Sequence, residues 1–280
     1  MSDPTLSSGT PLAAPRLRWD GDQPRAADFN DIYHAADGAA ETRRVFMAPA
    51  DLPRRWHATD RFTVAELGFG TGLNLAVLLE AWRAQRGDML QYISIERHPL
   101  SHAQWQRLCS ARQHALPAYA QLAGIYPPTV SGWHHRRLPE LGLSLHLYFG
   151  DATQAMGELE AQGFRAVDAW WLDGFAPDLN PDLWTPELLA RLAPLSAPGA
   201  TVTTFTAAGR VRRALSESGF EMRRVDQRPH KRETLAGVLR AHRPAPLPIG
   251  LAAARQRVES DGITIVGAGI AGASLAFVLA

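Results

Sequence analysis

The stretch Phe62-Thr-Val-Ala-Glu66-Leu67-Gly68-Phe-Gly70-Thr-Gly72-Leu73-Asn74-Leu-Ala-Val-Leu-Leu-Glu-Ala-Trp-Arg83 decides the fold of this 280-residue chain. Residues 62–67 form an apolar run typical of a buried strand, and residues 73–83 form an apolar helical stretch. Between them, three glycines at alternate positions let the backbone turn tightly and approach a ligand where a Cβ atom would collide. The stretch predicts a strand–turn–helix unit with a ligand site at its turn.

The same rhythm returns along the rest of the chain. Further strands are predicted at 91–95, 143–149, 166–172, 200–205, 220–225 and 235–239, and helices near 186–195 and 210–218. Strands that alternate with helical stretches indicate a mostly parallel sheet with helices on both faces. We therefore expect an α/β fold with a doubly wound sheet.

The chain is expected to divide into several parts. These are a disordered N-terminus (1–15), an N-terminal cap (16–60), the main α/β domain (61–243), a proline-rich linker (244–261) and a short final unit (262–280). The final unit begins a fresh strand and turn with Gly267, Gly269 and Gly272. One strand–turn–helix unit cannot bury its own apolar faces. We interpret it as the first piece of a second domain that this chain does not complete.

Composition and charge indicate an ordinary soluble globular protein. Hydrophobic residues make up 46% of the chain and the formal net charge is +1, so there is no overall basic excess to announce a nucleic-acid binder. Cys109 is the only cysteine, which excludes an intrachain disulfide and fits a reducing compartment. The sequence has no secretory signal and no apolar run near the ~20 residues that span a bilayer. We therefore predict a cytoplasmic protein that makes no membrane contact.

Acidic residues stand at the ends of three predicted strands. Glu66 precedes the first glycine of the turn, Glu96 closes the second strand and Asp151 follows the third. The glycines of the turn, spaced acid-x-Gly-x-Gly-x-Gly, differ from the Gly-x-Gly-x-x-Gly of dinucleotide sites. An acid on the strand would repel a pyrophosphate. Acids suit the sulfonium and ammonium charges of S-adenosylmethionine, with Glu96 on the ribose hydroxyls and Asp151 on the adenine amino group. The alternatives are that Glu96 is an ordinary surface glutamate and that Asp151 is the N-cap of a helix.

The fourth strand ends in Asp173-Gly174-Phe175-Ala176-Pro177, which can neither continue the strand nor start a helix at once. In open α/β sheets, ligands bind in the crevice beyond the carboxyl ends of the strands. In a methyl-transfer site this end faces the acceptor. There Asp173 would orient an amine or accept its proton, and Phe175 would stack on a flat base or cover the sulfonium. The alternative is an ordinary loop with a capping aspartate.

Residues from about 25 to 240 resemble the methyltransferase domain of the bifunctional family that makes 5-methylaminomethyl-2-thiouridine in tRNA (MnmC type). The matching stretches are Asp31–Tyr33, Gly38–Thr42, Val45-Phe46, Ala65–Asn74, Asp173–Pro177 with Asn180-Pro181 and Trp184, and Lys231–Glu233. Before Lys231 the family tends to have a glycine-rich approach, whereas this chain has Asp226-Gln-Arg-Pro-His230.

The resemblance implies a class I S-adenosylmethionine-dependent methyltransferase fold of the Rossmann-like type. The implied activity is that of a tRNA (5-aminomethyl-2-thiouridylate) methyltransferase, which methylates the aminomethyl group of the wobble uridine, and we expect no metal. In the family, a C-terminal FAD-dependent oxidase domain first removes a carboxymethyl group. Residues 267–272 resemble the FAD-binding turn of that domain. The acid expected ~20 residues further on is absent, so FAD is expected only in a full-length protein.

Together, the residue patterns and the resemblance name the candidate site residues. The catalytic candidates are Asp173 and Phe175. The cofactor-binding candidates are Tyr33, Glu66, Gly68, Gly70, Gly72, Asn74, Glu96 and Asp151, and the substrate candidates are Pro177, Trp184, Lys231 and Arg232. Pairs of basic residues elsewhere would either track tRNA phosphates or be solvated surface groups.

Two alternative interpretations remain open. The chain could be a fragment of an FAD- or nicotinamide-dependent oxidoreductase built on the turn at Gly267, or a noncatalytic RNA-binding module on a methyltransferase fold. The incomplete final unit argues against the first. Acids at all four strand ends argue against the second, because a binding module has no need of Asp173.

Overall fold

The computed structural model describes residues 12–21, 23–27, 31–32, 37–59, 61–84 and 89–240. The chain divides into two units, Met1–Arg243 and Pro244–Ala280, and every described residue belongs to the first. Three sets of predictions lie outside the described residues: disorder in 1–11, the role of Tyr33, and the linker and final unit with Gly267, Gly269 and Gly272.

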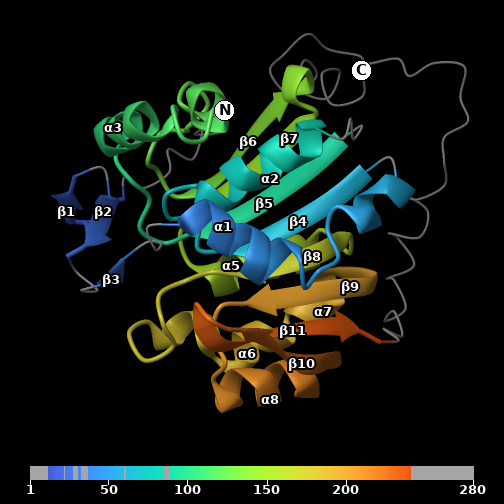
Figure 1. The fold of residues 1–280 in the computed structure, drawn as a ribbon. Coiled ribbons are helices and arrows are strands. Elements are labelled where there is room, and N and C mark those ends of the chain that lie inside the picture. Colours follow the sequence, from blue (N-terminus) through green and yellow to red (C-terminus); the bar gives the residue numbers. More distant parts are fainter. Residues whose placement is uncertain are drawn as a thin grey trace, which may run out of the picture. The chain divides into compact units, whose positions relative to one another are not determined.

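The centre of the fold is an eight-stranded sheet in the order β10-β11-β9-β8-β4-β5-β7-β6 (Figure 1). The strands are β4 (Arg61–Leu67), β5 (Met89–Glu96), β6 (Gly132–Leu138), β7 (Leu143–Phe149), β8 (Val167–Leu172), β9 (Ser196–Thr204), β10 (Phe220–Gln227) and β11 (Lys231–Leu239). The run β7-β5-β4-β8-β9 is parallel, whereas β6, β10 and β11 pair antiparallel. The chain winds outward from β4 in both directions, which confirms the predicted doubly wound, mostly parallel sheet.

Helices cover both faces of this sheet (Figure 1). The helices on one face are α2 (Leu73–Ala84), α3 (His102–Arg112) and α4 (Ala118–Leu122), and those on the other are α5 (Ala152–Ala161), α6 (Pro186–Ala190), α7 (Leu192–Leu195) and α8 (Gly209–Glu217). Successive side chains of a strand point to opposite faces. Accordingly, Val64 of β4 packs in a first core, under α2, α3 and α4, and Ala65 packs in a second core, under α5, α6, α7 and α8. Because both faces are covered, β4 and β8 are buried at nearly every position rather than at alternate ones.

The sequence did not predict β6. It is an edge strand, and its run of Trp133, His134, His135, Arg136 and Arg137 is partly or fully exposed. An exposed edge strand has no buried apolar face, so it lacks the hydrophobic period by which strands are identified.

The predicted helix at 186–195 is two short helices, α6 and α7, which meet at Arg191. Pro194 has no N–H to donate to the carbonyl group of Ala190, four residues earlier, and its ring would clash with that carbonyl. A continuous helix is therefore excluded at this point.

The N-terminal part combines a small sheet with short helical turns. Its elements are β1 (Leu17–Asp20), β2 (Gln23–Ala26), β3 (Asp31–Ile32), α1 (Gly38–Thr42), the π-helical turn η1 (Arg43–Met47) and the 3-10 turn η2 (Arg54–Ala58), with the three strands antiparallel. Val45, Phe46 and Met47 are buried in the first core, and the ring of Phe46 lies 5.6 Å from that of Trp171. The predicted cap is thus continuous with the core of the main domain.

Residues 12–15 also differ from the sequence-based expectation of disorder. The Leu12 amide donates a hydrogen bond to the carbonyl oxygen of Thr129 over 3.0 Å. The buried Pro15 accepts one from the Gln104 side chain over 2.9 Å. Predicted disorder therefore does not extend to these residues.

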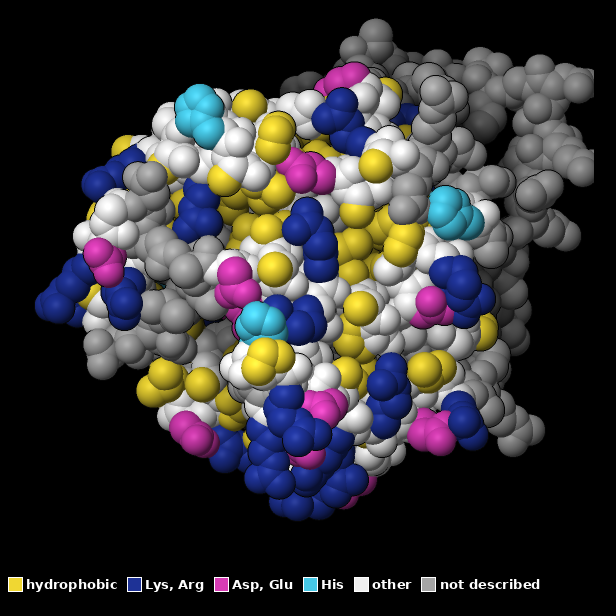
Figure 2. Space-filling model, viewed as in Figure 1, with side chains coloured by type: hydrophobic (Ala, Val, Ile, Leu, Met, Phe, Trp, Pro, Cys, Tyr) yellow, Lys and Arg dark blue, Asp and Glu magenta, His cyan; other side chains and the backbone are white. Residues whose placement is uncertain are grey.

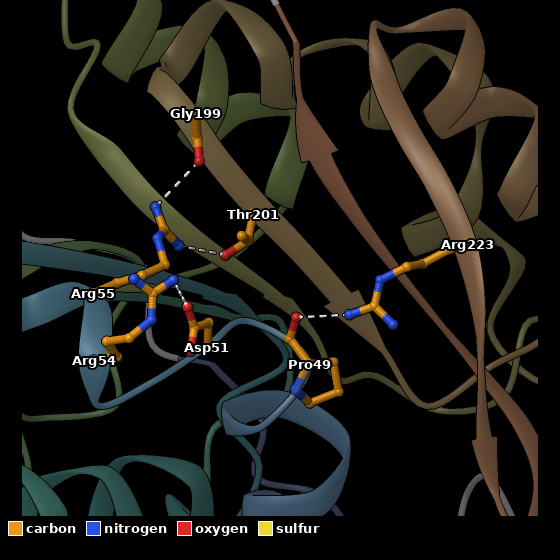
Figure 3. A network of polar contacts seen from close by, with 7 residues as sticks. All are labelled: Pro49, Asp51, Arg54, Arg55, Gly199, Thr201 and Arg223. Atoms are coloured by element: carbon orange, nitrogen blue, oxygen red, sulfur yellow. Dashed lines mark hydrogen bonds and ion pairs between the residues drawn. The ribbon is translucent and has the colours of Figure 1, made fainter.

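Arg55 ties the turn η2 to the sheet at the start of β9 (Figure 3). Its guanidinium donates to Thr201 Oγ1 over 2.8 Å and to the carbonyl oxygen of Gly199 over 3.2 Å. Nearby, Arg223 of β10 donates to the carbonyl oxygen of Pro49 over 3.2 Å. These contacts join the N-terminal turns to strands that lie more than a hundred residues later in the sequence.

We expect an Arg55→Met variant to lose about 1.5–3 kcal/mol of unfolding free energy, the range for hydrogen bonds to charged groups. The same guanidinium donates to the Asp168 carbonyl oxygen over 3.2 Å, and the Asp168 carboxylate accepts from the Thr63 amide over 2.8 Å. Burial lowers the pKa of Arg55 and raises that of Asp168, so removing the cation leaves a half-buried carboxylate without its counter-charge. Urea denaturation measures the loss. Arg54→Met is the control, since the Arg54 side chain is 81% exposed, and equal midpoints for the two variants would contradict the role of Arg55.

Candidate functional site

A cavity of about 260 Å³ opens at the carboxyl ends of β4, β5, β7 and β8, close to the size range of small-molecule sites. Its lining includes Glu41, Thr42, Phe46, Gly68, Gly70, Asn74, Glu96, Asp151, Asp173 and Phe175. Between β4 and β8 the winding of the sheet reverses, and such switch points are where open α/β sheets bind ligands. The predicted location of the site is therefore also the location of this cavity.

The glycine turn and the Asp173 loop are in direct backbone contact. Leu67 pairs with Leu172 in the β4–β8 register, so the next residues, Gly68 and Asp173, meet. The Asp173 amide donates to the Leu67 carbonyl oxygen over 2.9 Å. A Cβ atom on Gly68, where φ is +93°, would lie 2.0 Å from the carbonyl oxygen of Asp173. Only glycine lets the two strand ends approach this closely.

Glu96 holds the other side of the glycine turn. One carboxylate oxygen accepts a hydrogen bond from the Gly70 amide over 2.8 Å, and the other accepts from the His98 amide over 2.7 Å. A carboxylate has about four acceptor positions, so each oxygen keeps a lone pair beyond these bonds. A pair of hydroxyl groups on neighbouring carbons matches two such acceptors.

Asp151 caps α5 and also lines the cavity. The amides of Thr153 and Gln154 both donate to Asp151 Oδ1, over 2.9 and 3.1 Å. Both cap bonds thus use one oxygen, and capping does not require Oδ2. Capping α5 and accepting a hydrogen bond from an adenine amino group are therefore compatible roles for Asp151.

Asn74 bridges two buried carboxyl groups at the floor of the site. Its side-chain amide nitrogen donates to Glu66 Oε1 over 2.8 Å and to Asp173 Oδ2 over 2.6 Å. Its oxygen accepts from the Thr42 hydroxyl over 2.7 Å. A carboxylate oxygen only accepts hydrogen bonds, whereas the Thr42 hydroxyl can also donate, and this difference sets the orientation of the amide. The amide nitrogen therefore faces both carboxyl groups at once.

Burial and mutual charge raise the pKa values of these two acids. Burial raises the pKa of Glu66 to about 7, against the opposing hydrogen bonds from Ser94 and Asn74. Burial and the nearby charge of Glu66 hold the pKa of Asp173 well above its ordinary value. Two close carboxylates in a low-dielectric site do not both ionise readily. The pair therefore retains a proton that separate carboxyl groups in water would release.

Glu66 is not among the residues that line the cavity. It is 1% exposed, and its two oxygens are occupied by Asn74 and Ser94. The sequence-based expectation of a direct contact between Glu66 and a cationic ligand does not fit this geometry. Its contact with Asn74 gives it an indirect role.

The predicted substrate residues divide into two groups. Pro177 and Trp184 are buried outside the cavity lining, and the Trp184 indole donates to the Phe175 carbonyl oxygen over 3.0 Å. They support the loop that presents Phe175 to the cavity. Lys231 begins β11, and the neighbouring Arg232 is exposed and does not line the cavity. The structure therefore does not place Arg232 at the cavity.

The structure adds residues of α1 and η1 that sequence reasoning did not select. Glu41, Thr42 and Phe46 line the cavity from the N-terminal part of the chain. The charge of Glu41 contributes to the raised pKa of Asp173, so the two carboxyl groups are near one another. The sequence signal for Glu41 and Thr42 was that Gly38–Thr42 is one of the stretches that match the family. Nothing in its local pattern showed that α1 lies over the ends of the strands.

Among the described residues, no group of three or more His, Cys, Asp and Glu side chains is arranged to hold a metal ion. No helix in the same ranges has the length and apolar character that crossing a membrane requires.

Comparison with known proteins defines the class of the protein. Residues 115–240 match a family described as S-adenosyl-L-methionine-dependent methyltransferase. The crystal structure of MNMC2 from Aquifex aeolicus superposes with a TM-score of 0.65 at 22% identity, over 88% of this chain and 77% of that one, which supports the fold. Residues 115–240 of the chain therefore carry the sequence pattern of the S-adenosyl-L-methionine-dependent methyltransferases.

Within that class, the chain resembles MnmC proteins. It is 42% identical over 269 residues to the tRNA 5-methylaminomethyl-2-thiouridine biosynthesis bifunctional protein MnmC of Marinobacter nauticus, covering 93% of this chain and 41% of that protein. The MnmC protein of Caulobacter sp. (strain K31) is 40% identical over 287 residues, covering 99% of this chain and 44% of that protein. The resemblance inferred from the motifs is confirmed. The chain spans about two fifths of the length of these relatives.

Proposed function

We propose that this chain transfers a methyl group from S-adenosylmethionine to the primary amine of 5-aminomethyl-(2-thio)uridine at the wobble position of tRNA. The product is 5-methylaminomethyl-(2-thio)uridine. The observation that carries the proposal is the Asp173 carboxyl group, which lines the cavity while its backbone touches the glycine turn. The similarity to MnmC proteins supports the choice of acceptor.

The cavity residues fit S-adenosylmethionine. Gly68, Gly70 and Gly72 all have positive φ, and Gly68 and Gly70 line the cavity without a side chain. Glu96 would accept hydrogen bonds from the ribose hydroxyls, and Asp151 would accept one from the adenine amino group. Carboxyl groups on the rest of the lining favour a ligand with sulfonium and ammonium charges over one with phosphates. Bound there, the cofactor supplies an electrophilic methyl group.

Asp173 would prepare the acceptor. An aminomethyl group in water carries a proton, and its nitrogen has a lone pair for attack only after that proton leaves. Ionised Asp173 takes the proton, and Asn74 keeps the carboxyl group oriented by its 2.6 Å hydrogen bond. Phe175, on the same loop, would lie against the uracil ring and hold the nitrogen near attack distance. Methyl transfer then forms a carbon–nitrogen bond as the carbon–sulfur bond breaks.

The cell compartment and the flavin form the finer part of the proposal. We place the reaction in the cytoplasm, because its substrate is tRNA and the single cysteine fits a reducing compartment. FAD would serve only a longer protein in which residues 262–280 continue into an oxidase domain.

The test uses labelled S-adenosylmethionine and tRNA that carries the aminomethyl uridine. We expect label in 5-methylaminomethyl uridine at the wobble position by nucleoside analysis, and binding of the unlabelled cofactor by calorimetry. Cofactor binding without label in the tRNA would contradict the proposed acceptor. tRNA already methylated at this position is the control and should take up no label.

A further inference from the structure

We propose that the surface formed by α8, β10 and β11 binds the phosphate backbone of the tRNA whose uridine enters the cavity. We call this surface the basic edge. It consists of the exposed side chains of Arg210, Arg212, Arg213, Arg223, Arg224, Arg228 and Arg232. The inference rests on the proposed function and adds to it the part of the protein that holds the RNA.

Positive charge is concentrated on the basic edge. Residues 209–240 contain nine Lys and Arg against four Asp and Glu, whereas the whole chain has a net charge of only +1. Figure 2 shows dark blue side chains gathered over α8 and the adjoining ends of β10 and β11. Phosphate contacts supply most of the affinity of proteins for nucleic acids. The net charge of the whole chain is close to zero, but this surface is strongly basic.

The basic edge lies on the acceptor side of the site. In the sheet order, β9, β11 and β10 follow β8, whose end carries Asp173. Glu96 and Asp151 stand at the ends of β5 and β7, on the other side of β4. An RNA bound along α8 and β10 would therefore approach Asp173 without crossing the residues proposed to hold the cofactor.

Close contacts connect the elements of the basic edge with two segments that border the cavity lining. Arg210 of α8 pairs over 2.6 Å with Asp178, which lies in the loop that follows Asp173. His230, in the turn between β10 and β11, lies 4.0 Å from Asp37, next to α1. Phosphates bound on this surface would thus be adjacent to the opening through which a base must enter.

Five arginines of the basic edge are available to phosphate, whereas Arg223 donates to the Pro49 carbonyl oxygen and Arg224 pairs with Glu233. In the described part of the chain, Arg212, Arg213 and Arg232 make no ion pair with an acidic side chain. The Arg210 and Arg228 pairs join side chains that are more than half exposed, and such pairs contribute little stability in water. Arginine binds phosphate through two parallel hydrogen bonds.

The test removes two charges from the basic edge and two from the opposite edge of the sheet. Arg212→Gln with Arg213→Gln changes α8, and Arg136→Gln with Arg137→Gln changes β6, where both arginines are also exposed. tRNA affinity is measured by fluorescence anisotropy from low to physiological salt, together with kcat, KM for tRNA and the Kd of S-adenosylmethionine. We expect the α8 variant to lose at least about tenfold in tRNA affinity and to lower the salt slope by about 1 to 2. Its kcat at saturating tRNA and its cofactor Kd should stay unchanged, and the β6 variant should bind tRNA normally.

The outcomes separate this inference from the proposed function. Equal tRNA affinity of the two double variants, or a loss only in the β6 variant, would overturn the proposal that the basic edge binds tRNA. Methylation by the wild type would still uphold the proposed reaction. A wild-type protein that binds tRNA through α8 but transfers no methyl group upholds the surface and overturns the reaction. No tRNA binding by the wild type overturns both.

Discussion

An Asp173→Asn variant is expected to lose methyl transfer to the aminomethyl uridine by at least about 10²-fold, the range for removing a general base. Asparagine has the shape of the carboxyl group, and its oxygen can still accept the 2.6 Å hydrogen bond from Asn74. It cannot take a proton from the acceptor. Cofactor affinity should remain within about twofold, because the proposed cofactor contacts at Glu96 and Asp151 are unchanged. Single-turnover assays with saturating tRNA and S-adenosylmethionine measure the first effect, and calorimetry measures the second.

The pH dependence of the wild type tests the same assignment. The pKa of Asp173 is well above its ordinary value and that of Glu66 is raised to about 7. Lowering the pH therefore completes the protonation of the pair, and turnover should fall as the base is lost. Glu187→Gln, an exposed carboxyl group at the start of α6, is the control and should keep both the rate and the pH profile. Full turnover by the Asp173→Asn variant would remove Asp173 from the mechanism.

The strand ends of the site could be predicted from the sequence because each belongs to a local pattern. An apolar run that stops at Glu96, Asp151 or Asp173 shows both the strand and the residue at its end. The parallel sheet then brings these ends to one edge. Residue spacing alone therefore located the cavity that the structure contains.

The orientation of each side chain depended on contacts that no local pattern contains. Glu66 was expected to face the ligand, but its register partner Ser94 and the helix residue Asn74 occupy both of its oxygens. Thr42 completes this arrangement from a segment 32 residues before Asn74. Asn74 and Thr42 of this group line the cavity, and the family resemblance had named Asn74 without a reason. The structure supplies the reason, since one amide orients the carboxyl group proposed to act on the acceptor.

A Gly68→Ala variant is expected to lose about 3–5 kcal/mol of unfolding free energy, combining overpacking with strain at positive φ. The added Cβ atom would lie 2.0 Å from the Asp173 carbonyl oxygen, 2.9 Å from the Asp173 carbonyl carbon and 3.1 Å from Gly174 Cα. All three are backbone atoms, so no rotation of a side chain relieves the clash. The neighbouring strands also hold this point in place, through the bonds of Gly68 to Ile95 and of Asp173 to Leu67. Urea denaturation measures the loss.

Gly132→Ala separates the clash from the strain. Gly132 has a φ of +110°, close to the +93° of Gly68, but a Cβ atom there would meet nothing within 4 Å. It should therefore lose only the cost of an alanine at positive φ, about 1–2 kcal/mol. The difference between the two variants is the free energy of pushing the glycine turn and the Asp173 loop apart. Equal losses would mean that the loop moves freely. In that case the contact between Gly68 and Asp173 could not be what sets the distance from the cofactor turn to the proposed base.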